Sequence, residues 1–252
     1  MKHKTAGLIC AGGVSQSFLA RLPSVLAAVG PVFSSSLRVA RRMANSLRAG
    51  HAVDDLAAFA HCTAIWIVLP EAMLGRIFAR LHGVSLTGKT MIVCDTRRVS
   101  ESIPVTGAHV ATLQAADPGE RFFAAEGHPA ALRILRSALA REKRKLIELH
   151  PSAKPLFLAG TDLTSGLLLP CFGAGVESLR KAGFTRREAT SVAAVLGTEA
   201  LRAYLKAGRR AWKPATADVL RGVRKTDPHV ADPHIADVYH TAIEQALRYF
   251  AR

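Results

Sequence analysis

The sequence is poor in aromatic residues, in closely spaced cysteines and in long apolar runs. Aromatic residues make up 6% of the 252 residues, and no CxxC pair joins the four cysteines, Cys10, Cys62, Cys94 and Cys171. Zinc knuckles and redox dithiols use close cysteine pairs, so this spacing indicates buried thiols in a reducing compartment. No uninterrupted apolar stretch approaches the ~18 residues that span a bilayer. We therefore expect a cytoplasmic protein with no membrane partner.

Negative charge is also scarce, because 19 Asp and Glu stand against 34 Lys and Arg, giving a formal net charge of +15. That excess is compatible with nucleic acid, a membrane surface or a phosphorylated ligand. The most basic stretch, residues 206–225, contains a single aromatic residue, Trp212, and no nucleic-acid-reading motif is recognisable. Nucleic-acid binding is therefore the weakest hypothesis. A solvated basic face and the wall of an anion-binding cleft both remain open.

Apolar residues are plentiful, at 49% of the chain, so the composition can fill a core and excludes a disordered protein. In the first 150 residues, strand-like runs alternate with helical patterns, which predicts βαβ units in a parallel, doubly wound sheet. The expected strands cover residues 6–11, 31–34, 64–69, 89–94, 109–113 and 146–149. We expect a Rossmann-like α/β domain over residues 1–150.

After residue 150 the pattern is helical. A helix is expected over residues 156–182, interrupted at Pro170, and a second helix begins at the capping box formed by Thr185 and Glu188. Asp232 and Pro233 predict the start of the last helix. The sequence thus predicts an all-α domain over residues 151–252.

A glycine-rich turn follows the first expected strand, in the segment Ala11-Gly12-Gly13-Val14-Ser15. A strand, a glycine turn and a helix can hold a pyrophosphate on the helix N-terminal amides. A complete dinucleotide fingerprint would place glycine at Cys10, Gly12 and Ser15, and here only Gly12 is glycine. The turn therefore predicts either a nucleotide site or a tight structural turn without a ligand.

The second expected strand ends in Ser34-Ser35-Ser36-Leu37-Arg38, without a carboxylate. NAD sites usually place Asp or Glu there, whereas the 2′-phosphate of NADP favours hydroxyl groups and arginine. The segment therefore favours NADP over NAD. The alternative is that Arg38, Arg41 and Arg42 form the solvated face of a helix.

A cluster of histidines and aspartates near the C-terminus has helical spacing. Imidazole and carboxylate groups at such spacing can hold a divalent metal, but the two Asp-Pro pairs are typical of turns and helix caps. We favour capping and a solvated face, and predict no metal site. The cluster comprises Asp227, His229, Asp232, His234, Asp237 and His240.

Several segments resemble a known two-domain family. Residues 7–21, the strand end Val68-Leu69-Pro70-Glu71 and Gly88-Lys89 resemble a Rossmann-like oxidoreductase module. Glu126-Gly127-His128 and residues 220–227 resemble the remainder of that family, which carries a C-terminal helical domain of unknown function. The family is similar to pyrroline-5-carboxylate reductase and phosphogluconate-dehydrogenase-like proteins. The resemblance implies an NADP-type cofactor between the domains and a homodimer through the helical domain.

The resemblance and the loop together give the expected site. The cofactor-binding candidates are Gly12, Gly13, Val14, Ser15, Ser35, Ser36, Arg38 and Pro70. The substrate-facing candidates are Asp162, Ser165, Lys225 and Asp227. No catalytic residue is assigned, because Cys94-Asp95-Thr96 replaces a histidine-containing segment of the family. We expect an NADP-dependent oxidoreductase of a small carbonyl, imine or keto-acid substrate. The alternative is a catalytically silent nucleotide-binding or scaffold protein.

Overall fold

A computed structural model of the chain describes residues 6–12, 18–117, 119, 121–211 and 232–250. The chain divides into two compact units, Met1–Leu158 and Ala159–Arg252. We describe each unit separately.

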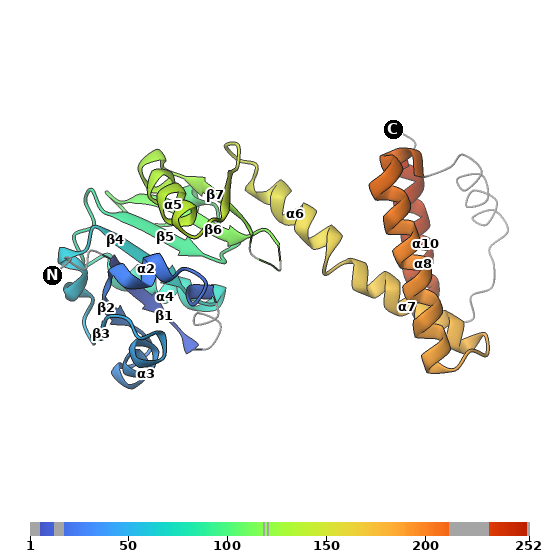
Figure 1. Cartoon of the computed structure of the whole chain (residues 1–252), viewed down its shortest axis with the longest axis horizontal. Helices are drawn as coiled ribbons and strands as arrows, with labels where there is room; N and C mark the ends of the chain where they lie inside the picture. Colours follow the sequence, from blue (N-terminus) through green and yellow to red (C-terminus); the bar gives the residue numbers. More distant parts are fainter. Residues whose placement is uncertain (1–5, 13–17, 118, 120, 212–231, 251–252) are drawn as a thin grey trace. The chain divides into compact units, whose positions relative to one another are not determined.

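The first unit is built on an eight-stranded sheet with the order β3-β2-β1-β4-β5-β6-β7-β8 (Figure 1). The strands are β1 (Ala6–Cys10), β2 (Val29–Phe33), β3 (His51–Ala52), β4 (Ala64–Val68), β5 (Thr90–Cys94), β6 (His109–Ala115), β7 (Phe122–Gly127) and β8 (Lys145–Glu148). All paired strands are parallel except β6 and β7. The prediction of a Rossmann-like α/β fold is therefore confirmed.

Helices cover both faces of this sheet. Side chains of α2 (Pro23–Ala28), α3 (Leu37–Leu47) and α5 (Pro129–Arg141) pack on one face, against residues such as Leu8 and Trp66. Helix α4 (Glu71–Leu81) and the short helix η1 (Leu56–His61) pack on the other face with Ile65 and Val93. The short helix η2 (Ser100–Ser102) contacts β6 and β7. Strands β1, β2, β4 and β5 are buried along their whole length, as apolar runs in a two-sided sheet should be.

Strand β7 corrects the expectation of a wholly parallel sheet. It pairs with β6 in antiparallel register, so that Thr112 lies opposite Glu126. Gly127 ends the strand with a φ of 136°. A Cβ at Gly127 would collide with the Val110 carbonyl oxygen, so only glycine allows this close approach. The run Phe122–Gly127 is short and ends in polar residues, and its strand character comes from pairing with β6.

The second unit is helical in its described part, as predicted. Its elements are the C-terminal part of α6 (Lys154–Thr164), then α7 (Leu168–Lys181), α8 (Arg186–Ala207), η3 (Gly208–Ala211) and α10 (Pro233–Phe250). The capping box of Thr185 and Glu188 is present at the start of α8. The Asp232 carboxylate accepts hydrogen bonds from the amides of His234 and Ile235, which confirms its predicted capping role.

The break in the first long helix lies at residues 165–167, not at Pro170. Pro170 sits in the first turn of α7, where its missing amide hydrogen leaves no helix bond unmade. Pro23 begins α2 in the same way.

The segment Lys154–Lys181, which contains α6 and α7, is long and apolar enough to cross a membrane by length and composition. Its best window has a mean hydropathy of 1.3 and is 6% buried. This differs from the expectation that no such segment exists. Cys171 on α7 is exposed, whereas the other three cysteines are buried as expected.

Candidate functional site

The topology of the sheet marks the carboxyl ends of its central strands as a candidate binding site. The chain leaves β1 for β2 and β3 on one side and returns to β4 on the other, so β1 and β4 are neighbours where the strand order reverses. In open α/β sheets, ligands bind outside the carboxyl ends of the strands at such a reversal. Cys10 pairs with Val68, so Gly12 and Pro70 both lie just beyond this point.

Gly12 has a backbone conformation that suits close approach by a ligand. Its φ is 57°, in the left-handed region, and no described atom lies within 4 Å of the position that a Cβ would take. Cys10, which occupies the preceding fingerprint position, is fully buried, and burial raises the pKa of its thiol to about 12. The Ser34 hydroxyl donates to the Cys10 carbonyl oxygen at 2.6 Å and ties the ends of β1 and β2 together.

The end of β2 presents hydroxyl and guanidinium groups. Ser36 caps α3, and its hydroxyl accepts from the Val39 amide at 3.3 Å while keeping its own hydrogen for a ligand. Ser35 and Arg38 are exposed beside it. The first-turn amides of α3 also point outward from the helix start, where an anion is stabilised. These groups fit a phosphate, which is the group the sequence predicted here.

The described cofactor candidates thus lie at the carboxyl ends of adjacent strands. They are Gly12, Ser35, Ser36, Arg38 and Pro70. Gly13, Val14 and Ser15 lie outside the described residues. Of the substrate candidates, Asp162 lies on α6, and the Ser165 hydroxyl donates to the Thr161 carbonyl oxygen at 2.5 Å. Lys225 and Asp227 also lie outside the described residues.

The segment after β5 is held to the start of α4 by the carboxylate of Glu71, to which the sequence analysis assigned no role. Glu71, at the start of α4, accepts hydrogen bonds from the Thr96 hydroxyl at 2.8 Å, the Arg97 amide at 3.2 Å and Arg98 Nε at 2.7 Å. Partial burial favours the neutral carboxyl, but the hydrogen bonds outweigh it and lower the pKa of Glu71. Between this clamp and β5 lies Asp95, whose φ is 52°.

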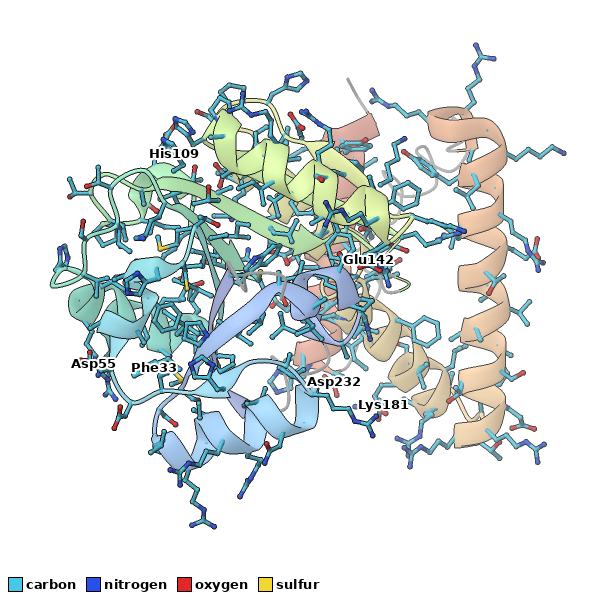
Figure 2. All side chains as sticks on the ribbon, turned by 60° about the vertical axis from the view of Figure 1, so that its left-hand side comes forward. Phe33, Asp55, His109, Glu142, Lys181 and Asp232 are labelled. Carbon is cyan, nitrogen blue, oxygen red and sulfur yellow. The ribbon has the colours of Figure 1, made fainter. Side chains whose placement is uncertain are left out.

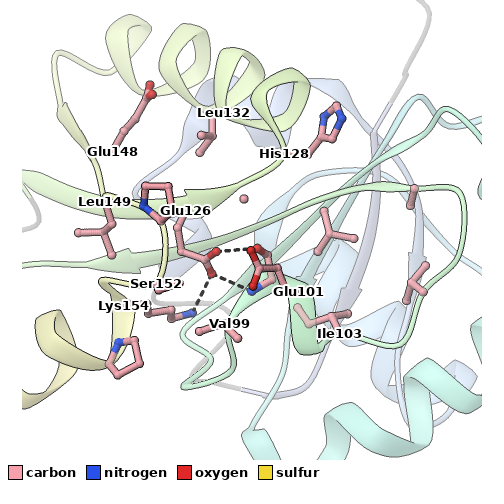
Figure 3. Close-up of a pocket in the computed structure, with 17 residues that line it drawn as sticks. Val99, Glu101, Ile103, Glu126, His128, Leu132, Glu148, Leu149, Ser152 and Lys154 are labelled. Carbon is pink, nitrogen blue, oxygen red and sulfur yellow. Dashed lines mark hydrogen bonds and ion pairs between the residues drawn. The ribbon is translucent and has the colours of Figure 1, made fainter.

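A cavity of about 780 Å³ lies within the first unit, beneath β6 and β7 and beside the start of α6 (Figure 3). Val99, Ile103 and Leu149 form part of its apolar wall. Glu126 and Lys154 form its polar wall, where their side chains point toward each other (Figure 3).

The two charged groups of this wall are joined through Thr112. Lys154 Nζ donates to the Thr112 hydroxyl at 2.7 Å and to the Arg98 carbonyl oxygen at 2.5 Å. The Thr112 hydroxyl donates in turn to Glu126 at 2.6 Å, and the amide and hydroxyl of Ser100 donate to the same carboxylate. The Lys154 side chain is 2% exposed, and its Nζ lies 3.8 Å from Glu126 Oε1.

Burial lowers the pKa of Lys154 to about 8, although the nearby carboxylates of Glu126 and Glu71 act in the opposite direction. The network fastens the first residue of α6 to the sheet and to the segment after β5. Sequence reasoning missed Lys154, because a lysine at a helix start is usually solvated and only the fold buries this one. Glu126 belongs to a segment that resembles the two-domain family, but the sequence analysis gave it no role.

Comparisons with known structures identify the same architecture over nearly the whole chain. An imine reductase from Pseudomonas sp. is 16% identical with a TM-score of 0.66, covering 99% of this chain and 93% of that one. A reductive aminase from Aspergillus terreus, in complex with NADPH4, cyclohexanone and allyl amine, is 16% identical with a TM-score of 0.64, covering 97% and 94%. A pyrroline-5-carboxylate reductase from Coxiella burnetii is 11% identical with a TM-score of 0.56, covering 99% and 98%.

At these identities the comparisons establish the fold alone, a Rossmann-like α/β sheet followed by a helical region. No family model and no curated protein matches the chain. The predicted resemblance is therefore confirmed for the architecture, and the particular helical-domain family remains a prediction.

Proposed function

We propose that the protein is an NADP-dependent oxidoreductase of a small carbonyl, imine or keto-acid substrate. The observation that carries the proposal is the end of β2, where Ser35, Ser36 and Arg38 stand without a carboxylate beside the strand-order reversal at Gly12. This set of donors fits a 2′-phosphate and offers no acceptor pair for the free ribose hydroxyls of NAD.

The chain's own residues would hold and orient the cofactor. Gly12 and the turn after it would receive the pyrophosphate, because the left-handed glycine leaves room for it. Pro70, at the start of α4, would border the other half of the dinucleotide. When bound, the reduced dinucleotide supplies the hydride, and the protein supplies position and charge.

Proteins of the same fold support the substrate class. The structures compared above include enzymes named for reducing imines and pyrroline-5-carboxylate. The proposal keeps the cytoplasmic location expected from the sequence.

The test is a titration of the protein with NADPH and NADH, followed by thermal melting and by tryptophan fluorescence. We expect NADPH to bind more tightly than NADH. Arg38→Ala should weaken NADPH binding by ~10- to 150-fold and leave NADH unchanged, because one charge-assisted hydrogen bond contributes ~1.5–3 kcal/mol. Arg133→Ala, an exposed arginine on α5, is the matched control and should change neither affinity.

The proposal fails if neither nucleotide shifts the melting temperature at millimolar concentration. If NADPH binds but no carbonyl, imine or keto-acid compound oxidises it, the catalytically silent alternative is correct.

We further propose that the helical unit forms a homodimer. Its described helices expose large apolar side chains that a monomer would leave in water. These are Leu163, Leu167, Leu168, Leu169, Phe172, Phe184, Val195, Leu196, Leu201, Tyr204, Leu205 and Tyr249. Exposed apolar surface on this scale marks an interaction site.

A further inference from the structure

The reacting half of a bound dinucleotide would lie near the end of β5, if the proposed function is correct. The groups for the 2′-phosphate lie at the end of β2, and the pyrophosphate position lies between β1 and β4. The other half must then extend past β4 toward β5, which is three strand spacings, or ~14 Å, from β2. Asp95 is the first residue after β5.

Asp95 has a backbone conformation that distinguishes it from other residues at this edge. Four described non-glycine residues have positive φ: Arg48, Asp95, Lys143 and Ser152. Arg48 and Lys143 follow the ends of α3 and α5, and Ser152 lies in the turn before α6, where left-handed residues are common. Asp95 instead follows a buried parallel strand at the ligand-binding edge.

The surrounding structure imposes this conformation from several sides. The Asp95 amide donates to the Leu113 carbonyl oxygen on β6 at 2.9 Å. Glu71 holds the following residues toward β4, and Lys154 holds the Arg98 carbonyl oxygen toward β6. A left-handed non-glycine residue costs ~1 kcal/mol or more, and such residues concentrate at functional sites. The molecule thus maintains a carboxyl group at this point against a local penalty.

The Asp95 side chain is exposed at the end of β5, so it is open to substrate and to water. Partial desolvation by neighbouring atoms raises the pKa of Asp95 above its ordinary value. The adjacent Cys94 thiol is fully buried, and burial raises its pKa as well, so that neighbour stays neutral. Of the charged groups nearby, Glu71 is engaged by Arg98, and Lys154 is engaged by Thr112 and the Arg98 carbonyl. A carboxyl group in such a setting can act as a general acid.

We propose that Asp95 is the catalytic acid of the reaction. The O–H bond of the Asp95 carboxyl breaks, and a bound reduced dinucleotide would supply the hydride that the substrate carbon receives. A new N–H or O–H bond forms on the heteroatom of the former double bond. The Asp95 carboxylate then recovers a proton from water, so one hydride and one proton are transferred per turnover.

The test compares wild-type protein with Asp95→Asn. Asparagine has nearly the same shape and tolerates left-handed φ, so the variant should fold, with a melting temperature equal to or above that of the wild type. We expect NADPH affinity to stay unchanged and kcat to fall ~100-fold or more. Asp54→Asn, an exposed carboxylate in the loop after β3, is the control and should behave as the wild type.

A second measurement does not depend on activity. In the NADPH complex, the ¹³Cγ resonance that Asp95→Asn removes should titrate above the ordinary aspartate pKa of 3.8. If the wild type oxidises NADPH and Asp95→Asn does so at the same rate and with the same pH profile, the role of Asp95 is overturned while the proposed function stands. If the wild type does not bind NADPH, both proposals fail together.

Discussion

The two units of the molecule differ in how many apolar side chains they bury. In the first unit, helices cover both faces of the sheet, and large side chains such as Phe59, Phe78 and Phe123 are fully buried. In residues 159–250, the buried apolar side chains that the structure describes are Ala189, Ala193, Ile235 and Ile243. The first unit therefore contains its own core, whereas the second holds its helices together with few buried groups.

Polar contacts differ between the units as well. The first unit buries a lysine and a carboxylate and joins them through Thr112. In the second unit, Lys181 on α7 pairs with Asp232 at the start of α10, and this pair is half-exposed (Figure 2). Removing one partner of a buried ion pair strongly destabilises the folded protein, whereas an exposed ion pair contributes little to stability. The comparison leads to three predictions.

The largest expected effect is on the stability of the first unit. Lys154→Ala should lower its free energy of unfolding by ~3–5 kcal/mol, because the buried Glu126 carboxylate loses its cation. Arg136→Ala is the control, since Arg136 pairs with Glu148 at the surface, and it should change stability by less than ~1 kcal/mol. Urea unfolding of both variants measures the difference. Equal effects would show that burial of the pair contributes nothing.

The next effect concerns the exposed apolar surface of the second unit. Leu201 and Leu205 are spaced i,i+4 on α8, so they share one face, and they are 58% and 76% exposed. Replacing both with Gln should convert the proposed dimer to a monomer, because each buried leucine contributes ~1.5–3 kcal/mol. Light scattering after size-exclusion chromatography measures the mass. Arg202→Gln with Lys206→Gln, on the same helix, should leave the dimer intact. A wild-type protein that is monomeric at all concentrations contradicts the proposal.

The smallest effect is a pH dependence of the first unit. The pKa of Lys154 is about 8 in the folded protein against 10.5 ordinarily, so above pH 8 the unfolded chain binds more protons than the folded one. Stability should therefore rise with pH from about 8 toward 10.5, and fall as pH drops through 8. Between pH 7 and 9, the stability of wild type relative to Lys154→Met should increase by ~1 kcal/mol. The cysteines, whose ordinary pKa is 9.0, titrate equally in both proteins, so the comparison with Lys154→Met cancels their contribution. A constant difference would show that Lys154 titrates normally.

Much of the fold could be read from local patterns. The strand over Ala64–Val68 is a continuous apolar run, and the α8 capping box is a short-range motif, so both were predictable. Strand β7 was not, because Phe122–Gly127 becomes a strand by pairing with β6 rather than by its own pattern. Likewise, the helix breaks at residues 165–167, whereas the proline that suggested the break lies in the first turn of the next helix.

Some residues of the candidate site could be predicted from the sequence, and others could not. Gly12 and the serine and arginine residues after β2 could be selected from the sequence, because phosphate recognition needs particular residue types at the ends of particular strands. Glu71, Asp95 and Lys154 lie far apart in the chain, and the sheet brings them to the segment after β5. The sequence by itself determined the α/β and helical halves, the basic charge and the residue types that we propose bind phosphate, since these depend on local composition. Only the tertiary structure decided which lysine is buried and which aspartate is held at the edge, because desolvation and strain arise from residues distant in sequence.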